Sequence, residues 1–349
     1  MKGLVIEEFE KPYSFRTDLP TPELEPGLML VKVKVAGFCH TELLVLDGEY
    51  HSQLPMIPGH ENVGVIAAIG EAVTGFNVGD RVGVGLFRKA CGQCRECANG
   101  TSNFCSSVEL AGLNVDGGMA EYVLADPAWT VHLPDEMPFV KAAPLMCAGS
   151  TVYNSIKRAN LAKGGIIGII GLGGLGHLAV QFAKLLGYQC VGVDTRRAPR
   201  DLVASLPSTF SADLLIDPSE GTEAALSTIS ASLDGATGLG AAIVCTDAIE
   251  AYRFATSILA KHGILVAVGQ PKGEIPFHWS TFVSQDITIV PGGLGSNAMT
   301  QEMINIVQEK ELHVEVKEFP FGTDTFERLM NEYRSEGMSG KVVIRIEDE

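Results

Sequence analysis

The sequence predicts a two-domain α/β protein, with a compact β-barrel-type domain followed by a doubly wound parallel sheet. Its 349 residues are enough for two domains. Residues 1–150 contain short strand-like runs and many turns, whereas residues 151–294 alternate strands with helices. Such βαβ alternation places a parallel sheet between helices on both faces. The alternation stops near residue 295, so residues 295–349 are expected to return to the first domain.

Alternating and apolar runs predict the strands of the first domain. The opening MKGLVIEEFE reads as a strand, and LMLVKVKVAG (28–37) alternates apolar and polar residues with period two. Further along, VGVIAAIG (63–70) and RVGVGLF (81–87) are apolar runs bounded by glycine or Gly-Asp turns. Few helical patterns interrupt these runs, which favours a closed, mostly β domain.

The second domain is predicted from five apolar runs with helical segments between them. A helix is expected after the first run, ending at Gly187. A further helix near 299–310 and a closing strand at 341–346 are expected to belong with the first domain. The five predicted strands are 166–170, 190–194, 214–217, 241–245 and 263–269.

Charge and hydropathy exclude several classes of function. The formal net charge is −16, which argues against nucleic acid and against anionic membrane surfaces as partners. The N-terminus lacks the basic and apolar regions of a secretory signal, and the longest apolar stretch (166–178) is too short to span a bilayer. Because cysteines that bind metal suit a reducing compartment, we expect a cytoplasmic protein.

Four clustered cysteines predict a structural zinc site. They have the spacing C-x2-C-x2-C-x7-C, and an all-thiolate site is closed, so it shapes a loop without taking part in chemistry. Cys190 and Cys245 lie in apolar strand-like runs and are expected to be inert core residues. The four ligands are Cys91, Cys94, Cys97 and Cys105.

A glycine-rich turn between the first strand and helix of the second domain predicts a dinucleotide site. The motif is Gly171-Leu172-Gly173-Gly174-Leu175-Gly176, G-x-G-x-x-G in the strand-turn-helix context that it requires. Asp194 follows the next strand, where a carboxylate binds the ribose hydroxyls and repels a 2′-phosphate, which favours NAD. Arg196 and Arg197 come directly afterwards and leave NADP open.

With these motifs in place, the chain resembles the zinc-dependent alcohol dehydrogenases of the medium-chain dehydrogenase/reductase superfamily, and is most similar to the microbial, yeast-like type. The resemblance covers essentially the whole length. It rests on CHT (39–41), PGHENVGVI (58–66), the four-cysteine loop, GGMAEYV (117–123), PLMCAGSTVY (144–153) and GLGGLGHLAVQFAK (171–184), in the family's order. It implies a GroES-like catalytic domain, a Rossmann domain for NAD, and two Zn²⁺ ions per chain.

The resemblance also implies roles for individual residues. Cys39, His60 and Cys147 would bind the catalytic Zn²⁺, with Glu61 behind the metal, and Thr41 would hydrogen-bond the substrate hydroxyl. A zinc site with three protein ligands leaves a fourth position for water or substrate. The residues expected to contact the cofactor, besides the glycine-rich turn and Asp194, are His40, Thr246, Val268, Gly293, Leu294 and Lys341.

Two departures from the family pattern concern the catalytic site. The family usually has aspartate where this chain has Glu42, one methylene longer, at the position that orients the histidine ligand. Many members also have a histidine at the position of Leu44, which ends a proton relay to solvent. The relay is therefore expected to end at the ribose hydroxyl and water, with His51 as the alternative.

Expectations about the substrate and the assembly also follow from the resemblance. Tyr50 and Leu86 are expected to line the substrate pocket, with Phe87 nearby, and leucine at 86 favours an alcohol or aldehyde larger than ethanol. Trp279 and Phe282 are expected in core or interface packing of a homodimer or homotetramer. Two alternatives are an NADPH-linked aldehyde reductase on the same scaffold and a non-catalytic relative that binds the cofactor. Asp194 argues against the NADPH-linked reductase, and the complete ligand set argues against the non-catalytic relative. A polyol enzyme on the same scaffold would typically have glutamate as its third zinc ligand, and Cys147 argues against it.

Overall fold

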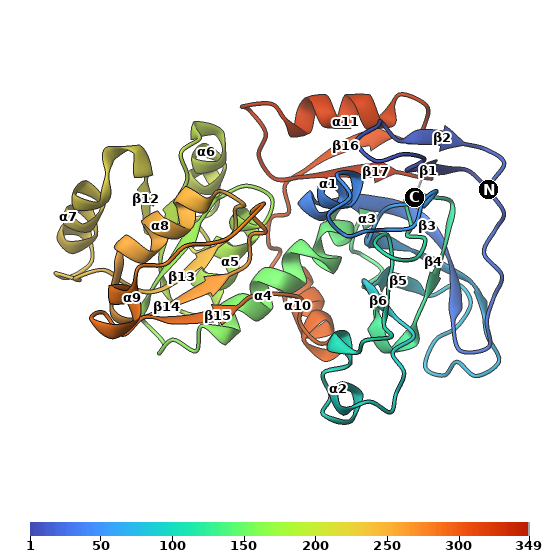
Figure 1. Cartoon of the computed structure of the whole chain (residues 1–349), viewed down its shortest axis with the longest axis horizontal. Coiled ribbons are helices and arrows are strands. Elements are labelled where there is room, and N and C mark those ends of the chain that lie inside the picture. Colours follow the sequence, from blue (N-terminus) through green and yellow to red (C-terminus); the bar gives the residue numbers. More distant parts are fainter. Residues whose placement is uncertain (348–349) are drawn as a thin grey trace.

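A parallel six-stranded sheet forms one half of the molecule (Figure 1). The computed structural model describes residues 1–347. The strand order is β12-β11-β10-β13-β14-β15, so the order reverses between β10 and β13, as in doubly wound dinucleotide-binding sheets. The strands are β10 (Ile166–Ile170), β11 (Gln189–Val193), β12 (Leu214–Ile216), β13 (Leu239–Val244), β14 (Leu259–Ala267) and β15 (Thr288–Pro291).

Helices cover both faces of this sheet because alternate residues of its strands enter two different cores. Ile167 and Ile169 of β10 pack with Phe182 of α5, whereas Ile170 packs with Tyr252 of α8. The helices of this half are α4 (Ala148–Arg158), α5 (Gly176–Leu185), α6 (Arg197–Ser205), α7 (Thr222–Ser232), α8 (Ile249–Ser257) and α9 (Trp279–Val283), with the 3₁₀ turn η4 (Pro218–Glu220).

The other half is built on a mostly antiparallel sheet of order β16-β17-β3-β4-β5-β9, in which β8 also pairs with β3. The C-terminal strand β17 pairs with β3, so the end of the chain returns to this half. The strands are β3 (Met29–Phe38), β4 (Glu61–Ile69), β5 (Arg81–Val84), β8 (Tyr122–Ala125), β9 (Thr130–His132), β16 (Val316–Pro320) and β17 (Lys341–Arg345). Two small sheets join β1 (Gly3–Val5) with β2 (Ser14–Arg16) and β6 (Phe87–Arg88) with β7 (Glu109–Leu110).

Short helices connect the strands of this half. They are α1 (His40–Leu46), α2 (Arg95–Ala98), α3 (Phe139–Ala142), α10 (Asn297–Glu309) and α11 (Thr325–Tyr333), with 3₁₀ turns η1 (Ser102–Phe104), η2 (Pro127–Trp129) and η3 (Ala143–Met146). One continuous core crosses between the halves, because Val63 of β4, Val152 of α4, Ile243 of β13 and Met303 of α10 belong to the same buried cluster. The two sheets are therefore held by a shared apolar interface.

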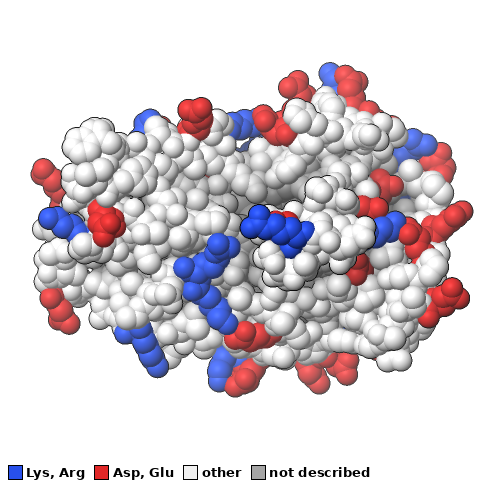
Figure 2. All heavy atoms as spheres, turned by 60° about the horizontal axis from the view of Figure 1, so that its bottom comes forward, with Lys and Arg blue, Asp and Glu red and all other residues white. Residues whose placement is uncertain are grey.

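The predicted fold class is confirmed, with small differences at element ends. Strand 166–170 has the expected bounds, whereas β14 begins at Leu259, four residues before the predicted start. The domain boundaries at residues 150 and 294 stay predictions, and α4 runs across the first of them. Within residues 1–347, no helix is long and apolar enough to cross a bilayer. Figure 2 shows acidic and basic side chains on the same face, with wide areas that carry neither.

Candidate active site and metal centres

Four metal-binding side chains from three separate segments meet in one buried cluster. Cys39 follows β3 and precedes α1, His60 directly precedes β4 and Glu61 begins it, and Cys147 precedes α4. One ligand atom from each residue lies within 4.8 Å of the other three. The fold therefore joins residues that sequence spacing alone cannot connect.

Glu42 holds two members of this cluster in place. Its Oε2 accepts the backbone N–H of Cys39 at 2.8 Å, and its Oε1 lies 2.6 Å from His60 Nδ1. Because Nδ1 faces Glu42, the other ring nitrogen is left for the cluster. The longer side chain of glutamate thus caps the first turn of α1 and orients the imidazole with a single carboxylate.

A buried ion pair lies beside the cluster. Lys341 Nζ donates to Glu61 Oε1 at 2.7 Å and to the carbonyl of Phe38 at 2.9 Å. Burial disfavours the ammonium, but Glu61 and the thiols of Cys39 and Cys147 outweigh it and raise the pKa of Lys341. Burial pushes the pKa of Glu61 upward, whereas the Lys341 ammonium acts in the opposite direction and favours the carboxylate. Lys341 therefore faces the metal cluster with its terminal amine.

The donor set of this cluster fits Zn²⁺. It offers two thiols and an imidazole, which are ligands that zinc prefers. The second carboxylate oxygen of Glu61, Oε2, is buried and has no hydrogen-bond partner. A buried carboxylate oxygen without a partner is costly, and a cation in the cluster would satisfy it.

A cleft of about 830 Å³ connects this cluster with the glycine-rich turn. Gly171 has φ +92°, which favours glycine, and a Cβ on Gly176 would clash with the carbonyl oxygen of Gly171. A Cβ added to Gly173 would have only one neighbour within 4 Å, the Arg196 guanidinium at 3.3 Å. The turn is thus open on the cleft side and leads into the N-terminus of α5, an arrangement suited to a pyrophosphate.

Asp194 braces the turn and lies beside an arginine. Its Oδ2 accepts the N–H of Leu172 and its Oδ1 the N–H of Arg196, both at 2.8 Å. The Arg196 side chain crosses the cleft and donates to the carbonyl of Met338 at 3.1 Å. Arg197 instead points to solvent, where it pairs with Asp201. Asp194 and Arg196 therefore lie on the cleft, whereas Arg197 does not line it.

The structure brings most of the predicted cofactor residues to this cleft. Its walls include His40, Thr41, Leu175, Thr246, Val268 and Lys341. Within the wall, Thr41 Oγ1 lies 3.7 Å from Cys39 Sγ, and His40 Nε2 lies 3.4 Å from Asp247 Oδ2. Gly293 and Leu294 do not line this cleft, and their carbonyls accept hydrogen bonds from Asn154 Nδ2.

The residues expected around the substrate lie in different places. The Tyr50 hydroxyl reaches the cleft wall, 3.4 Å from Gln270 Oε1. Leu86 lines a separate cavity of about 20 Å³ together with Phe87 and Leu294, so its place in a substrate pocket stays a prediction. His51 is exposed and does not line the cleft, and Leu44 is buried.

The remaining cysteines and two large apolar residues lie outside the metal cluster. Cys190 is buried in the core of the six-stranded sheet, whereas Cys245 is half-buried and lines the cleft. Trp279 and Phe282 are 63% and 47% exposed, so they are not core residues of this chain. Asp247 and Gln270 also line the cleft and were not predicted from the sequence, although both follow strand ends where a parallel sheet binds its ligands.

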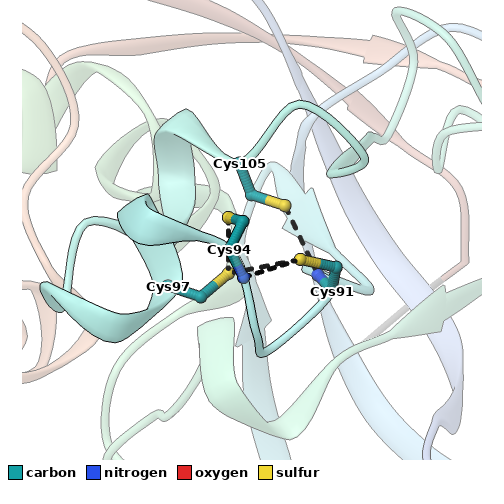
Figure 3. Close-up of side chains that lie close together, drawn as sticks. All are labelled: Cys91, Cys94, Cys97 and Cys105. Atoms are coloured by element: carbon teal, nitrogen blue, oxygen red, sulfur yellow. Dashed lines mark hydrogen bonds between the residues drawn. The ribbon is translucent and has the colours of Figure 1, made fainter.

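The four clustered cysteines converge as predicted (Figure 3). Their sulfurs lie within 4.8 Å of one another on the loop that contains α2 and η1. Two backbone N–H groups donate to sulfur, from Cys94 to Cys91 at 3.3 Å and from Cys91 to Cys105 at 3.4 Å. The bond from Cys91 contributes most to lowering the pKa of Cys105, to about 6. Burial instead raises the pKa of Cys97 to about 12. The convergence of four sulfurs is what suits a tetrahedral zinc site.

Known proteins match this chain along its whole length. Residues 25–135 match the family model "Alcohol dehydrogenase GroES-like domain", and residues 174–309 match "Zinc-binding dehydrogenase". An alcohol dehydrogenase of Geobacillus stearothermophilus is 34% identical, over 99% of this chain and all of its own. The alcohol dehydrogenase of Aeropyrum pernix superimposes with TM-score 0.89 at 27% identity, over 99% of this chain and 100% of that one. Acetophenone reductase of Geotrichum candidum, in complex with NAD, gives TM-score 0.83 at 25% identity, over 100% and 98%.

Proposed function

This chain belongs to the zinc-containing alcohol dehydrogenase family, and we propose that it transfers a hydride reversibly between a small-molecule alcohol and NAD, giving an aldehyde or ketone. The observation that supports this most directly is the position of the buried cluster. The cluster of Cys39, His60, Glu61 and Cys147 meets the cleft through its two cysteines, and the other walls of the cleft include the glycine-rich turn. A substrate at the cluster and a dinucleotide on the turn would therefore share one cavity.

We assign the catalytic Zn²⁺ to Cys39, His60 and Cys147, and the structural Zn²⁺ to the four-cysteine loop. When bound, the catalytic ion supplies a Lewis acid that lowers the pKa of the substrate hydroxyl. Glu42 orients His60 through Nδ1, and Lys341 neutralises Glu61 behind the cluster. These contacts keep the ligands in a fixed arrangement before substrate arrives.

Thr41 and His40 are proposed to handle the proton and the cofactor. Thr41 Oγ1 lies beside Cys39 in the cleft wall, where it can accept the hydrogen bond of the substrate hydroxyl. His40 pairs with Asp247 on the opposite wall and is assigned to cofactor binding. Since Leu44 cannot carry a proton and His51 lies outside the cleft wall, the proton is proposed to leave through the ribose hydroxyls and water.

NAD is the proposed cofactor, and the nicotinamide accepts the hydride. The supporting observation is the placement of Asp194 on the cleft, where a carboxylate favours ribose hydroxyls and repels a 2′-phosphate. Arg196 is the specific observation that favours the second candidate, an NADPH-linked aldehyde reductase, because its guanidinium lies 3.6 Å from Asp194 over the same part of the cleft.

Four finer assignments extend this proposal. We propose a cytoplasmic homotetramer or homodimer that acts on an alcohol larger than ethanol, and cofactor contacts from the backbone at Gly293 and Leu294. The exposed Trp279 and Phe282 on α9 support an assembly through this part of the molecule.

The assay that tests this function measures NADH and NADPH oxidation across a series of aldehydes, alongside zinc content. We expect two zinc atoms per chain and a clear preference for NADH. Cys147→Ser should lower the zinc content to one and reduce kcat/KM by about 1,000-fold, because several kcal/mol of transition-state stabilisation is lost.

The matched control is Cys190→Ala, which changes a buried cysteine away from the cluster and should keep both zinc atoms. A fully active wild-type chain with one zinc atom would contradict the assignment of two sites. Preference for NADPH would instead favour the reductase.

A further inference from the structure

Two polar side chains from the two halves of the molecule meet at the mouth of the cleft, which Gln270 lines. Tyr50 follows α1, and Gln270 follows β14 after Val268 and Gly269, which line the same cleft. The Tyr50 hydroxyl lies 3.4 Å from Gln270 Oε1, a long hydrogen bond between two exposed side chains. This contact is weak enough for a ligand to compete with it.

Tyr50 lies close enough to the metal cluster to sense its charge. Burial contributes most to raising the pKa of Tyr50, and the thiols of Cys39 and Cys147 add to the shift. The phenol therefore stays protonated over the working pH range. Gln270 lines the same cleft as Cys39 and Cys147, so a molecule bound at the cluster shares that cavity with Gln270 and its partner Tyr50.

The pair has unused capacity for hydrogen bonds. When the Tyr50 hydroxyl donates to Gln270 Oε1, the phenol oxygen still offers a lone pair and Gln270 Nε2 still offers two N–H groups. Among residues 1–347, no other side chain or backbone group bonds these atoms. A donor and an acceptor thus stand side by side at the cleft mouth.

We propose that Tyr50 and Gln270 recognise a second, uncharged hydroxyl group on the substrate, so that diols and hydroxyaldehydes are preferred over plain alkanols. A hydroxyl both donates and accepts, and therefore matches the phenol oxygen and the amide N–H groups together. A carboxylate would accept from the amide N–H groups but has no proton to donate to the phenol oxygen. This inference rests on the proposed function and adds a polar contact to the larger substrate expected from Leu86.

The test compares substrates that share four carbons: 1-butanol and its 1,2-, 1,3- and 1,4-diols. With the zinc-loaded chain and NAD, we expect kcat/KM for at least one diol to exceed that for 1-butanol about fivefold, the size of one or two hydrogen bonds. Gln270→Leu, similar in shape but without hydrogen-bonding groups, should bring this ratio to about one. Tyr50→Phe should lower it in the same direction.

Glu274→Gln is the matched control, because Glu274 is exposed on the same loop and does not line the cleft. It should keep the wild-type ratio. Equal kcat/KM for 1-butanol and all three diols would overturn the inference about diols and leave the proposed function standing. A diol preference that survives both Gln270→Leu and Tyr50→Phe would do the same. If no alcohol were oxidised with either cofactor, the proposed function itself would fall.

Discussion

At the scale of a single residue, His177 couples the cofactor turn to the C-terminal segment. Its Nε2 accepts the backbone N–H of Glu315 at 3.2 Å, so Nδ1 carries the proton and donates to the carbonyl of Gly173 at 3.1 Å. If the imidazole were protonated at Nε2 as well, that N–H would point at the backbone N–H of Glu315, and the hydrogen bond between them would be lost. Burial accordingly lowers the pKa of His177 to about 4. The hydrogen bonds of His177 to Gly173 and Glu315 therefore require a neutral imidazole.

This arrangement predicts a loss of stability in mild acid. Below pH 6.5 the unfolded chain binds a proton at His177, whereas the folded chain does so only near pH 4. Stability therefore falls as the pH drops through this window, by about 2 kcal/mol between pH 6.5 and 5. Melting temperatures at pH 7 and pH 5 test this. His177→Gln, neutral at both values, should narrow the difference, and the exposed control His51→Gln should not change it.

Local patterns predicted the four-cysteine loop and the cofactor turn, whereas Cys39, His60 and Cys147 were expected together only from the family resemblance. Cysteine spacing identified the four-cysteine loop, and the glycine spacing identified the turn. Both could be recognised because each is formed by residues that are close together in the sequence. The contact of Tyr50 with Gln270 joins residues far apart in sequence and has no local pattern. The same is true of Asn154, whose side chain holds the backbone at Gly293 from another element.

At the scale of secondary structure elements, the edge of the six-stranded sheet is the most conspicuous surface. β15 is its last strand, and the neighbouring helix α9 exposes three large apolar side chains. Trp279, Phe282 and Val283 are 63%, 47% and 77% exposed. An open strand edge beside an apolar helix is unfavourable in water and suited to pairing with a second copy.

A charge on this helix should therefore separate the chains. Phe282→Glu is expected to convert a dimer or tetramer into single chains at micromolar concentration, because the carboxylate would be buried without a partner. Light scattering after size-exclusion chromatography measures the mass. Val78→Glu changes an exposed apolar residue on the other half of the molecule and should leave the assembly intact. A wild-type chain that already elutes as a monomer would contradict the prediction.

Element ends show where sequence patterns stop being informative. β10 could be predicted to the residue because its apolar run is bounded on both sides by glycine. β14 extends back to Leu259 through the polar residues Lys261 and His262, since Leu259 still pairs with Leu239 across a register shift. That pairing depends on the neighbouring strand, which apolar periodicity does not report.

At the scale of the whole molecule, three polar contacts span the cleft mouth between the two sheets. Two of them join His40 to Asp247 and Tyr50 to Gln270, and in the third Lys272 Nζ lies 2.6 Å from Asp47 Oδ2. On one side all three partners come from α1 or the turn after it, and on the other side from loops that follow β13 and β14. A bound dinucleotide could leave in two ways. Either these segments separate first, or the cleft is already wide enough for it to pass.

The pair of Asp47 and Lys272 distinguishes these two cases. If separation limits release, Lys272→Met should speed NADH dissociation about twofold to fivefold at low salt, the effect of one exposed ion pair. The difference should disappear near 1 M salt, where exposed charges are screened. Stopped-flow NADH fluorescence measures both rates, with Lys261→Met as the control for loss of an exposed positive charge elsewhere on the same sheet. Equal rates for wild type and Lys272→Met at low salt would show that the cofactor leaves without opening this contact.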